Sequence, residues 1–151
     1  MQISAAERWL KWFLRITGTS ALTALVFVAA PYSWMDAIHQ WLGMGKLPDE
    51  PIVGYLARST SAFYALLGGL LWVVSFHLRR NRLVLQYLGI AMVLFGITFF
   101  VVDLVEGMPL FWKVCEGPID VIFGIVLLWF SHRIKQMSLD KSKADVETDR
   151  E

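Results

Sequence analysis

Apolar residues along this chain gather into four long runs separated by short polar stretches. The runs cover residues 16–34, 52–76, 83–102 and 110–130. Crossing the hydrocarbon core of a bilayer takes about 20 mostly apolar residues in a helix, and each run meets or approaches that length. The pattern therefore predicts four transmembrane helices with short connections, forming an all-α integral membrane four-helix bundle within residues 1–135.

The first run has a competing interpretation as a cleaved signal peptide, because basic residues precede an apolar stretch that ends in small residues. Pro31 directly after Ala30 is unfavourable for cleavage, and Glu7 and Trp9 are unusual in a leader. We interpret the run as a retained signal-anchor helix.

Basic residues near the ends of the runs predict the orientation, because cytoplasmic connections carry an excess of Lys and Arg. They gather in three segments, which hold Arg8, Lys11 and Arg15, then Arg79, Arg80 and Arg82, and finally Arg133 and Lys135. With four spans, all three segments fall on one side of the membrane, whereas the two opposite connections are mainly acidic. We expect both termini to be cytoplasmic.

Two segments outside the runs have their own patterns. Residues 36–45 carry apolar positions separated by His39 and Gln40, which predicts a short helix lying in the outer interface; a plain surface loop is the alternative. Residues 136–151 are charged and lack aromatic residues, so we expect a disordered cytoplasmic tail beyond a fraying helix end.

Composition supports a membrane protein and narrows its chemistry. Of the 151 residues, 56% are hydrophobic and 18% charged, against about 25% charged in a typical soluble domain. The formal net charge of +1 gives no basic surface for nucleic acid. The single cysteine, Cys115, excludes an intrachain disulfide and any multi-cysteine metal site.

Ionisable residues inside three runs share helix faces with small residues, which mark close approach between membrane helices. At 100° per residue, each of the last three runs has one such face. The three faces hold Arg58, Ala65 and Gly69 with Ser61 at the edge, then Gly89, Gly96 and Asp103, and finally Lys113, Gly117, Asp120 and Gly124. We therefore expect the charges to face the bundle interior and the small residues to pack the helices.

These charged residues also lie at a similar depth, toward the outer side. The candidate polar pocket consists of Arg58, Asp103, Glu106, Lys113, Glu116 and Asp120. A charge near the bilayer centre costs about 2.5–3.5 kcal/mol on insertion scales, so partners are expected. Three interpretations stay open: an ion-paired network that locks the helices, a binding or catalytic pocket, or a shorter last span that starts at Gly117 and leaves Lys113 and Glu116 among headgroups.

Motifs of common enzymes are absent from the sequence. It has no HExxH, no glycine-rich phosphate loop and no nucleophile elbow, so an enzyme acting alone is disfavoured. A carboxylate metal site from Asp103, Glu116 and Asp120 is conceivable but is the least favoured interpretation of these acids. No cofactor is evident.

Several stretches resemble the DoxX-like group of small four-helix bacterial membrane proteins, over roughly residues 30–130. They are APYSWM, WLGMGKLPDEP, YLARSTSAFYALLGG and FGITFFVVDLVEGMPLFWKVCEGPIDVIFGIVLLW. The order of features is an early arginine (Arg58), an acid (Asp103), a turn at Gly107-Met108-Pro109, and a second acid (Glu116 or Asp120). The resemblance implies the bacterial cytoplasmic (inner) membrane, and its quinone-reducing namesake complex implies a quinone or lipid-like ligand.

Two classes of function follow. The first is a non-catalytic membrane subunit or scaffold, which seats a membrane protein partner or a second copy of itself. The second is a binder of a quinone, lipid headgroup or small metabolite in the polar pocket.

Overall fold

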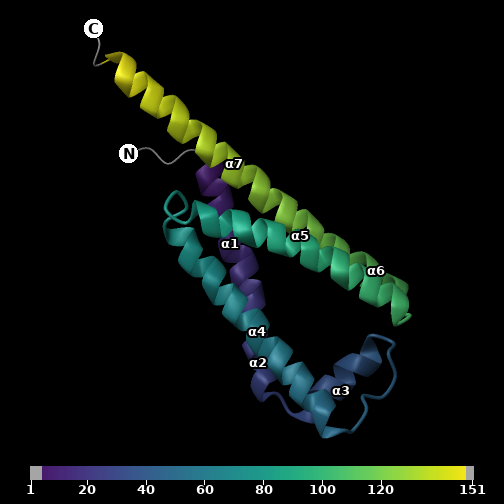
Figure 1. Ribbon diagram of the computed structural model, residues 1–151. Helices are drawn as coiled ribbons and strands as arrows, with labels where there is room; N and C mark the ends of the chain where they lie inside the picture. Colours follow the sequence, from purple (N-terminus) through teal and green to yellow (C-terminus); the bar gives the residue numbers. More distant parts are fainter. Residues whose placement is uncertain (1–4, 149–151) are drawn as a thin grey trace. The chain divides into compact units, whose positions relative to one another are not determined.

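The computed structural model describes the backbone of residues 5–148 and the side chains of residues 5–134 and 136. All regular elements in this part are helices (Figure 1). They are α1 (Ala5–Leu22), α2 (Leu25–Ala29), α3 (Tyr32–Trp41), α4 (Pro51–Phe76), α5 (Arg82–Val105), α6 (Leu110–Cys115) and α7 (Gly117–Thr148).

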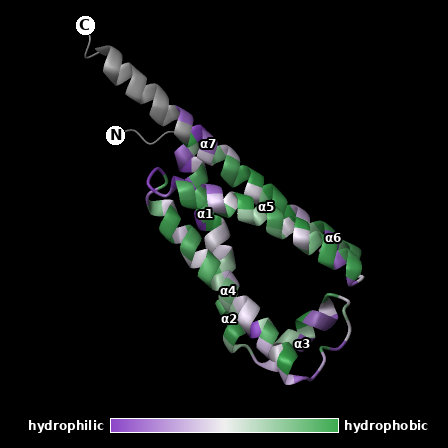
Figure 2. Cartoon of the chain, in the orientation of Figure 1, coloured by the Kyte–Doolittle hydropathy of each residue, from purple (hydrophilic) through white to green (hydrophobic). Residues whose placement is uncertain are grey.

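Four helical segments are long and apolar enough to cross a membrane, which confirms the predicted number of spans. They are Ala5–Ala29, Pro51–Phe76, Arg82–Val105 and Leu110–Ile134. Hydrophobic residues run along α4, α5 and the described part of α7, whereas hydrophilic residues gather in the α3–α4 and α4–α5 connections (Figure 2). The chain is an all-α integral membrane protein.

The first span differs in position from the predicted residues 16–34. It begins at Ala5 and ends at Ala29. Ala30 is extended, with ψ of 142°, because the ring of Pro31 disfavours helical backbone in the residue before it. Pro31 also lacks the N–H that would continue the helix, so the chain starts a new helix, α3, at Tyr32.

The chain divides into two compact units. One unit comprises Met1–Lys11 and His77–Glu151. In it α5 and α7 run antiparallel side by side, and α6 adjoins α7 (Figure 1). The other unit, Trp12–Phe76, packs α2 against α4.

The short helix α3 starts four residues before the predicted interfacial helix and ends before Gly43. Gly43 and Met44 donate backbone hydrogen bonds to Gln40 and His39 at 2.9 and 3.1 Å. This pattern with a left-handed glycine, φ 75°, is a Schellman helix end. Beyond the last span, α7 continues to Thr148, where the sequence predicts disorder. Residues 149–151 lie outside the described part.

Candidate functional site

Two glycine pairs bring α5 and α7 into close contact. A Cβ added to Gly96 would lie 2.5 Å from the carbonyl oxygen of Gly117, and one added to Gly124 would lie 2.5 Å from that of Gly89. Real Cβ atoms essentially never come so close to backbone, so only glycine permits this distance between the helices. The four glycines that the sequence places on helix-packing faces of these spans therefore meet in two pairs.

Asp103 lies seven residues after Gly96, on the same face of α5. Its side chain is 3% exposed, and its Oδ2 atom has no hydrogen-bond partner in the described part of the chain. The helix ends just beyond it, where Gly107 has a φ of 70° and the Met108 N–H donates to the Asp103 carbonyl oxygen at 3.0 Å. Asp103 is thus fixed at a helix end while its carboxylate keeps unused hydrogen-bonding capacity.

Glu116 sits at the break between α6 and α7. Pro118 has no N–H to continue the helical hydrogen bonds and disfavours helical backbone before it. The Glu116 N–H donates to the carbonyl oxygen of Trp112 at 2.9 Å, and its carboxylate accepts a hydrogen bond from the Trp112 indole Nε1–H. Asp120 follows one turn later, and its N–H donates to the Glu116 carbonyl oxygen at 3.2 Å.

Asp103, Glu116 and Asp120 form what we call the acidic cluster. Asp103 and Asp120 both act electrostatically on Glu116. Glu116 and Asp120 are half-buried, whereas Asp103 is buried. Among the described residues of this unit, no lysine or arginine forms an ion pair with any of the three. The acidic cluster therefore consists of acids from two membrane spans, Arg82–Val105 and Leu110–Ile134.

The other two predicted site residues of this unit lie at its margin. Lys113 is half-buried on α6 and forms no ion pair among the described residues. Glu106 is the exposed C-cap of α5, and its backbone N–H donates to the Val102 carbonyl oxygen. Neither residue neutralises the acidic cluster in the described structure.

Arg58 belongs to the other unit, where it holds the end of α2. Its Nη1 donates to the Val28 carbonyl oxygen at 2.6 Å and its Nη2 to the Ala30 carbonyl oxygen at 2.9 Å. These carbonyls lie just before Pro31, where the interrupted helix supplies no N–H groups for them. Arg58 thus has a capping role that the apolar pattern of the sequence does not predict. Its pairing with the acids of spans three and four stays a prediction.

Gly68 makes a small-residue contact on α4 within this unit, and the packing role of its neighbour Gly69 stays a prediction. A Cβ on Gly68 would lie 2.6 Å from the carbonyl oxygen of Gly18 on α1, whereas one on Gly69 would meet nothing within 4 Å in the described chain. Ala65 is buried, and the Ser61 hydroxyl donates to the Ala57 carbonyl oxygen at 2.8 Å within its own helix. The sequence feature that points to this contact is Gly18 in the first apolar run, which was not among the small residues assigned to helix faces.

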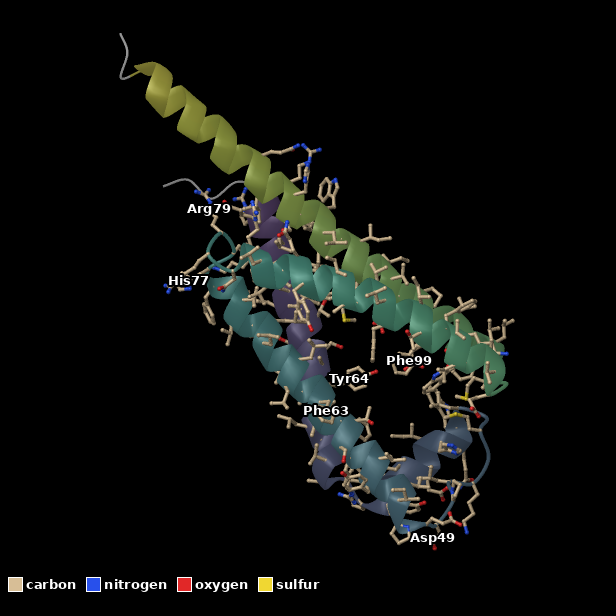
Figure 3. All side chains as sticks on the ribbon, viewed as in Figure 1. Asp49, Phe63, Tyr64, His77, Arg79 and Phe99 are labelled. Carbon is tan, nitrogen blue, oxygen red and sulfur yellow. The ribbon has the colours of Figure 1, made fainter. Side chains whose placement is uncertain are left out.

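An ion pair between Glu7 and Arg79 was also missed. Arg79 projects from the α4–α5 connection (Figure 3), and its Nε lies 2.5 Å from Glu7 Oε1 while its Nη2 lies 3.2 Å from Oε2. Hydrogen bonding to Glu7 raises the pKa of the Arg79 guanidinium further above its usual value. The sequence feature that could have predicted this pair is a single acid in a basic N-terminal arm, together with an arginine-rich connection.

The α3–α4 connection, which includes Asp49 (Figure 3), is organised by Asp36. Asp36 Oδ1 accepts the Leu47 N–H at 2.8 Å and Oδ2 accepts the Gln40 side-chain N–H at 2.9 Å. These two hydrogen bonds, the one from Leu47 first, hold the pKa of Asp36 below its usual value. His39 Nδ1 lies 2.8 Å from the Gly45 carbonyl oxygen and ties the same turn.

Metal binding receives no support from the described residues. Among them no group of three His, Cys, Asp or Glu side chains is arranged to hold a metal ion.

Comparison with known proteins adds no relative to this picture. No protein-family model, no curated protein and no solved structure matches the chain.

Proposed function

We propose that the protein is a non-catalytic subunit or scaffold of the bacterial cytoplasmic membrane, with four spans and both termini in the cytoplasm. The distribution of Lys and Arg in the connections supports this orientation. We further propose that it is a DoxX-like protein, on the order of Arg58, Asp103, the Gly107 turn and Glu116 along the chain.

One observation carries the scaffold role: charged side chains are used to fasten the protein's own helices. Arg58 caps α2, and Arg15 donates to Ser75 at 3.2 Å while its guanidinium lies 4.8 Å from the centre of the Trp72 ring. Such interactions make a rigid frame but add no nucleophile or base. A rigid helical frame with apolar outer faces is what a membrane subunit offers to a partner or to a second copy of itself.

Native mass spectrometry of the gently solubilised full chain tests this role. We expect a complex of fixed stoichiometry, either with one protein partner or with a second copy. A monomer that carries no protein under conditions that preserve other membrane complexes contradicts the proposal.

A second candidate function is the binding of a small ligand at the acidic cluster. The buried Asp103 carboxylate, with no donor for Oδ2 among the described residues, favours it. Leaving a buried polar atom without a partner costs about 1–3 kcal/mol, which a ligand that donates a hydrogen bond would recover.

A further inference from the structure

Basic side chains from three segments gather at one end of the unit that contains α5 and α7. The segments are the start of α1, the α4–α5 connection with the first residue of α5, and the part of α7 that follows Phe130. Figure 2 shows hydrophilic residues in the connection and in this part of α7. We call the set of described basic side chains in these segments the basic end, and it consists of Arg8, Lys11, Arg79, Arg80, Arg82 and Arg133.

The two glycine pairs set the antiparallel register that brings two of these segments together. Gly89 meets Gly124, and the other pair lies seven residues away on each helix, in opposite chain directions. A position seven residues before Gly89 therefore lies level with one seven residues after Gly124. These positions are Arg82 and Ser131, and Arg133 follows shortly after on α7.

The Glu7–Arg79 ion pair holds the start of α1 at the same end (Figure 3). Arg79 Nε lies 2.5 Å from Glu7 Oε1, and Arg8 and Lys11 follow on the same helix. Glu7 is the one acid among the described side chains of the three segments, and Arg79 already engages it. Six positive groups against this one negative group leave a formal charge of +5 at the basic end, with the histidines taken as neutral.

Exposed tryptophans at this end indicate that its surroundings are a membrane interface. Trp129 is 52% exposed, and Arg133 Cζ lies 5.3 Å from the centre of its ring. Trp9, next to Arg8, is 72% exposed. Tryptophan is enriched at the headgroup level of a bilayer, where arginine side chains extend toward the phosphates. A membrane surface therefore fits the basic end better than a soluble polyanion does.

We propose that the basic end binds anionic phospholipid headgroups of the leaflet that it faces, which is the cytoplasmic leaflet in the proposed orientation. This inference goes beyond the scaffold role and does not depend on it. Each Lys or Arg near an anionic membrane surface strengthens the attraction about fivefold. Guanidinium groups also bind phosphate oxygens bidentately, and five of the six bases are arginines. Zwitterionic headgroups have no net charge, so the basic end should select against them.

The experiment is native mass spectrometry of the full chain in a neutral detergent, titrated with equal amounts of phosphatidylglycerol and phosphatidylcholine of one acyl composition. Arg80→Gln removes one exposed charge of the basic end, and a double variant adds Arg8→Gln from another segment. Arg80→Lys keeps the charge. Lys46→Gln is the matched control, because Lys46 is an exposed base in the α3–α4 connection, where Asp49 and Glu50 follow it.

We expect the wild-type chain to retain phosphatidylglycerol in preference to phosphatidylcholine. Arg80→Gln should lower this preference about fivefold and the double variant about 25-fold, whereas Arg80→Lys and Lys46→Gln should leave it unchanged. Added salt should lower the preference as well, because it screens exposed charges. Circular dichroism shows whether each variant is folded; if Arg80→Gln is not, Arg8→Gln alone decides.

Three outcomes overturn the proposal. One is equal retention of the two lipids, and another is an equal loss of preference in Lys46→Gln and Arg80→Gln. The third is loss of the preference when inorganic phosphate is added at the concentration of the lipid, since the basic end would then bind free phosphate. The spectra keep this inference separate from the scaffold role, because bound protein and bound lipid are counted independently.

Discussion

Gly96 of α5 and Gly117 of α7 lie so close that a Cβ on either residue would be within 2.6 Å of the other's carbonyl oxygen. Lipid gives helices no hydrophobic drive to associate, so this backbone contact and its van der Waals packing hold the pair together. A second pair, Gly89 and Gly124, repeats the arrangement two turns away.

Gly96→Ala should therefore destabilise the α5–α7 pair by about 1–3 kcal/mol, because the added methyl group meets backbone that cannot move aside easily. Gly69→Ala is the matched control on α4, where the methyl group meets nothing within 4 Å in the described chain. We expect the control to be neutral or to stabilise by up to about 1 kcal/mol through helix propensity. Thermal unfolding in detergent compares the stabilities of the two variants. An equal loss of stability in Gly96→Ala and Gly69→Ala contradicts the close contact.

Arg58→Leu should lower the free energy of unfolding by about 1–3 kcal/mol, because the Val28 and Ala30 carbonyls lose their hydrogen-bond donors. Arg80→Leu, an exposed arginine in the α4–α5 connection, serves as the control. The double variant with Asp103→Asn separates two roles of Arg58. Additive losses indicate capping alone, whereas a coupling of about 0.5–3 kcal/mol indicates the predicted pairing with the acids.

In the Glu7–Arg79 ion pair, Arg79→Gln should destabilise the protein more than Glu7→Gln. Breaking a buried ion pair costs about 3–5 kcal/mol. The Arg79 side chain is 39% exposed and that of Glu7 is 7% exposed, so solvent screens the pair in part. We therefore expect Arg79→Gln to lower the free energy of unfolding by about 1–2 kcal/mol. Glu7→Gln should cost less, since the remaining guanidinium reaches water. Denaturant unfolding with Arg8→Gln as control measures both, and a larger loss for Glu7→Gln contradicts this account.

The α3–α4 connection should loosen in acid. The folded pKa of Asp36 is lowered, so its stabilising contribution is fully present above the unfolded carboxyl pKa, about 3.9, and is lost as pH falls through the lower folded value. Hydrogen exchange at the Leu47 amide, corrected for its intrinsic pH dependence, reports this loss. Asp36→Asn should remove the pH dependence, and an unchanged profile in that variant would falsify the assignment to Asp36.

Accessibility labelling tests the orientation. In a Cys115→Ser background, which removes the only cysteine, we expect Pro48→Cys to react with an impermeant maleimide added outside intact cells. Arg80→Cys should react only after the membrane is permeabilised. The reverse pattern would place both termini outside and refute the orientation that the basic residues predict.

The sequence predicts the later spans closely because long apolar runs translate directly into helices. The predicted residues 52–76 and 83–102 differ from α4 and α5 by at most three residues at any end. The start of the first span was predicted too late, at residue 16, because the charged residues Glu7, Arg8 and Lys11 are typical of a polar segment before a span. The fold includes them in α1, where Glu7 is held by Arg79.

Helix periodicity predicts which site residues share a helix face, but it does not predict their partners. It places Asp103 on a face with Gly89 and Gly96, and the structure brings both glycines against α7. It does not reveal which carbonyls Arg58 meets, because those depend on the break at Pro31. It also does not reveal the contact of Gly68 with Gly18, because Gly18 lies in another run.

The seven-residue spacing within each helix keeps both glycine pairs on one face of α5 and one face of α7. One residue inserted between Gly89 and Gly96 would turn every later α5 position by about 100°, removing one pair and rotating Asp103 away from its face. A matching insertion between Gly117 and Gly124 would keep the rise of the two segments equal but would turn the later α7 positions as well, so the lost pair would not form again. Insertions and deletions in either segment should therefore be poorly tolerated, whether they occur singly or together.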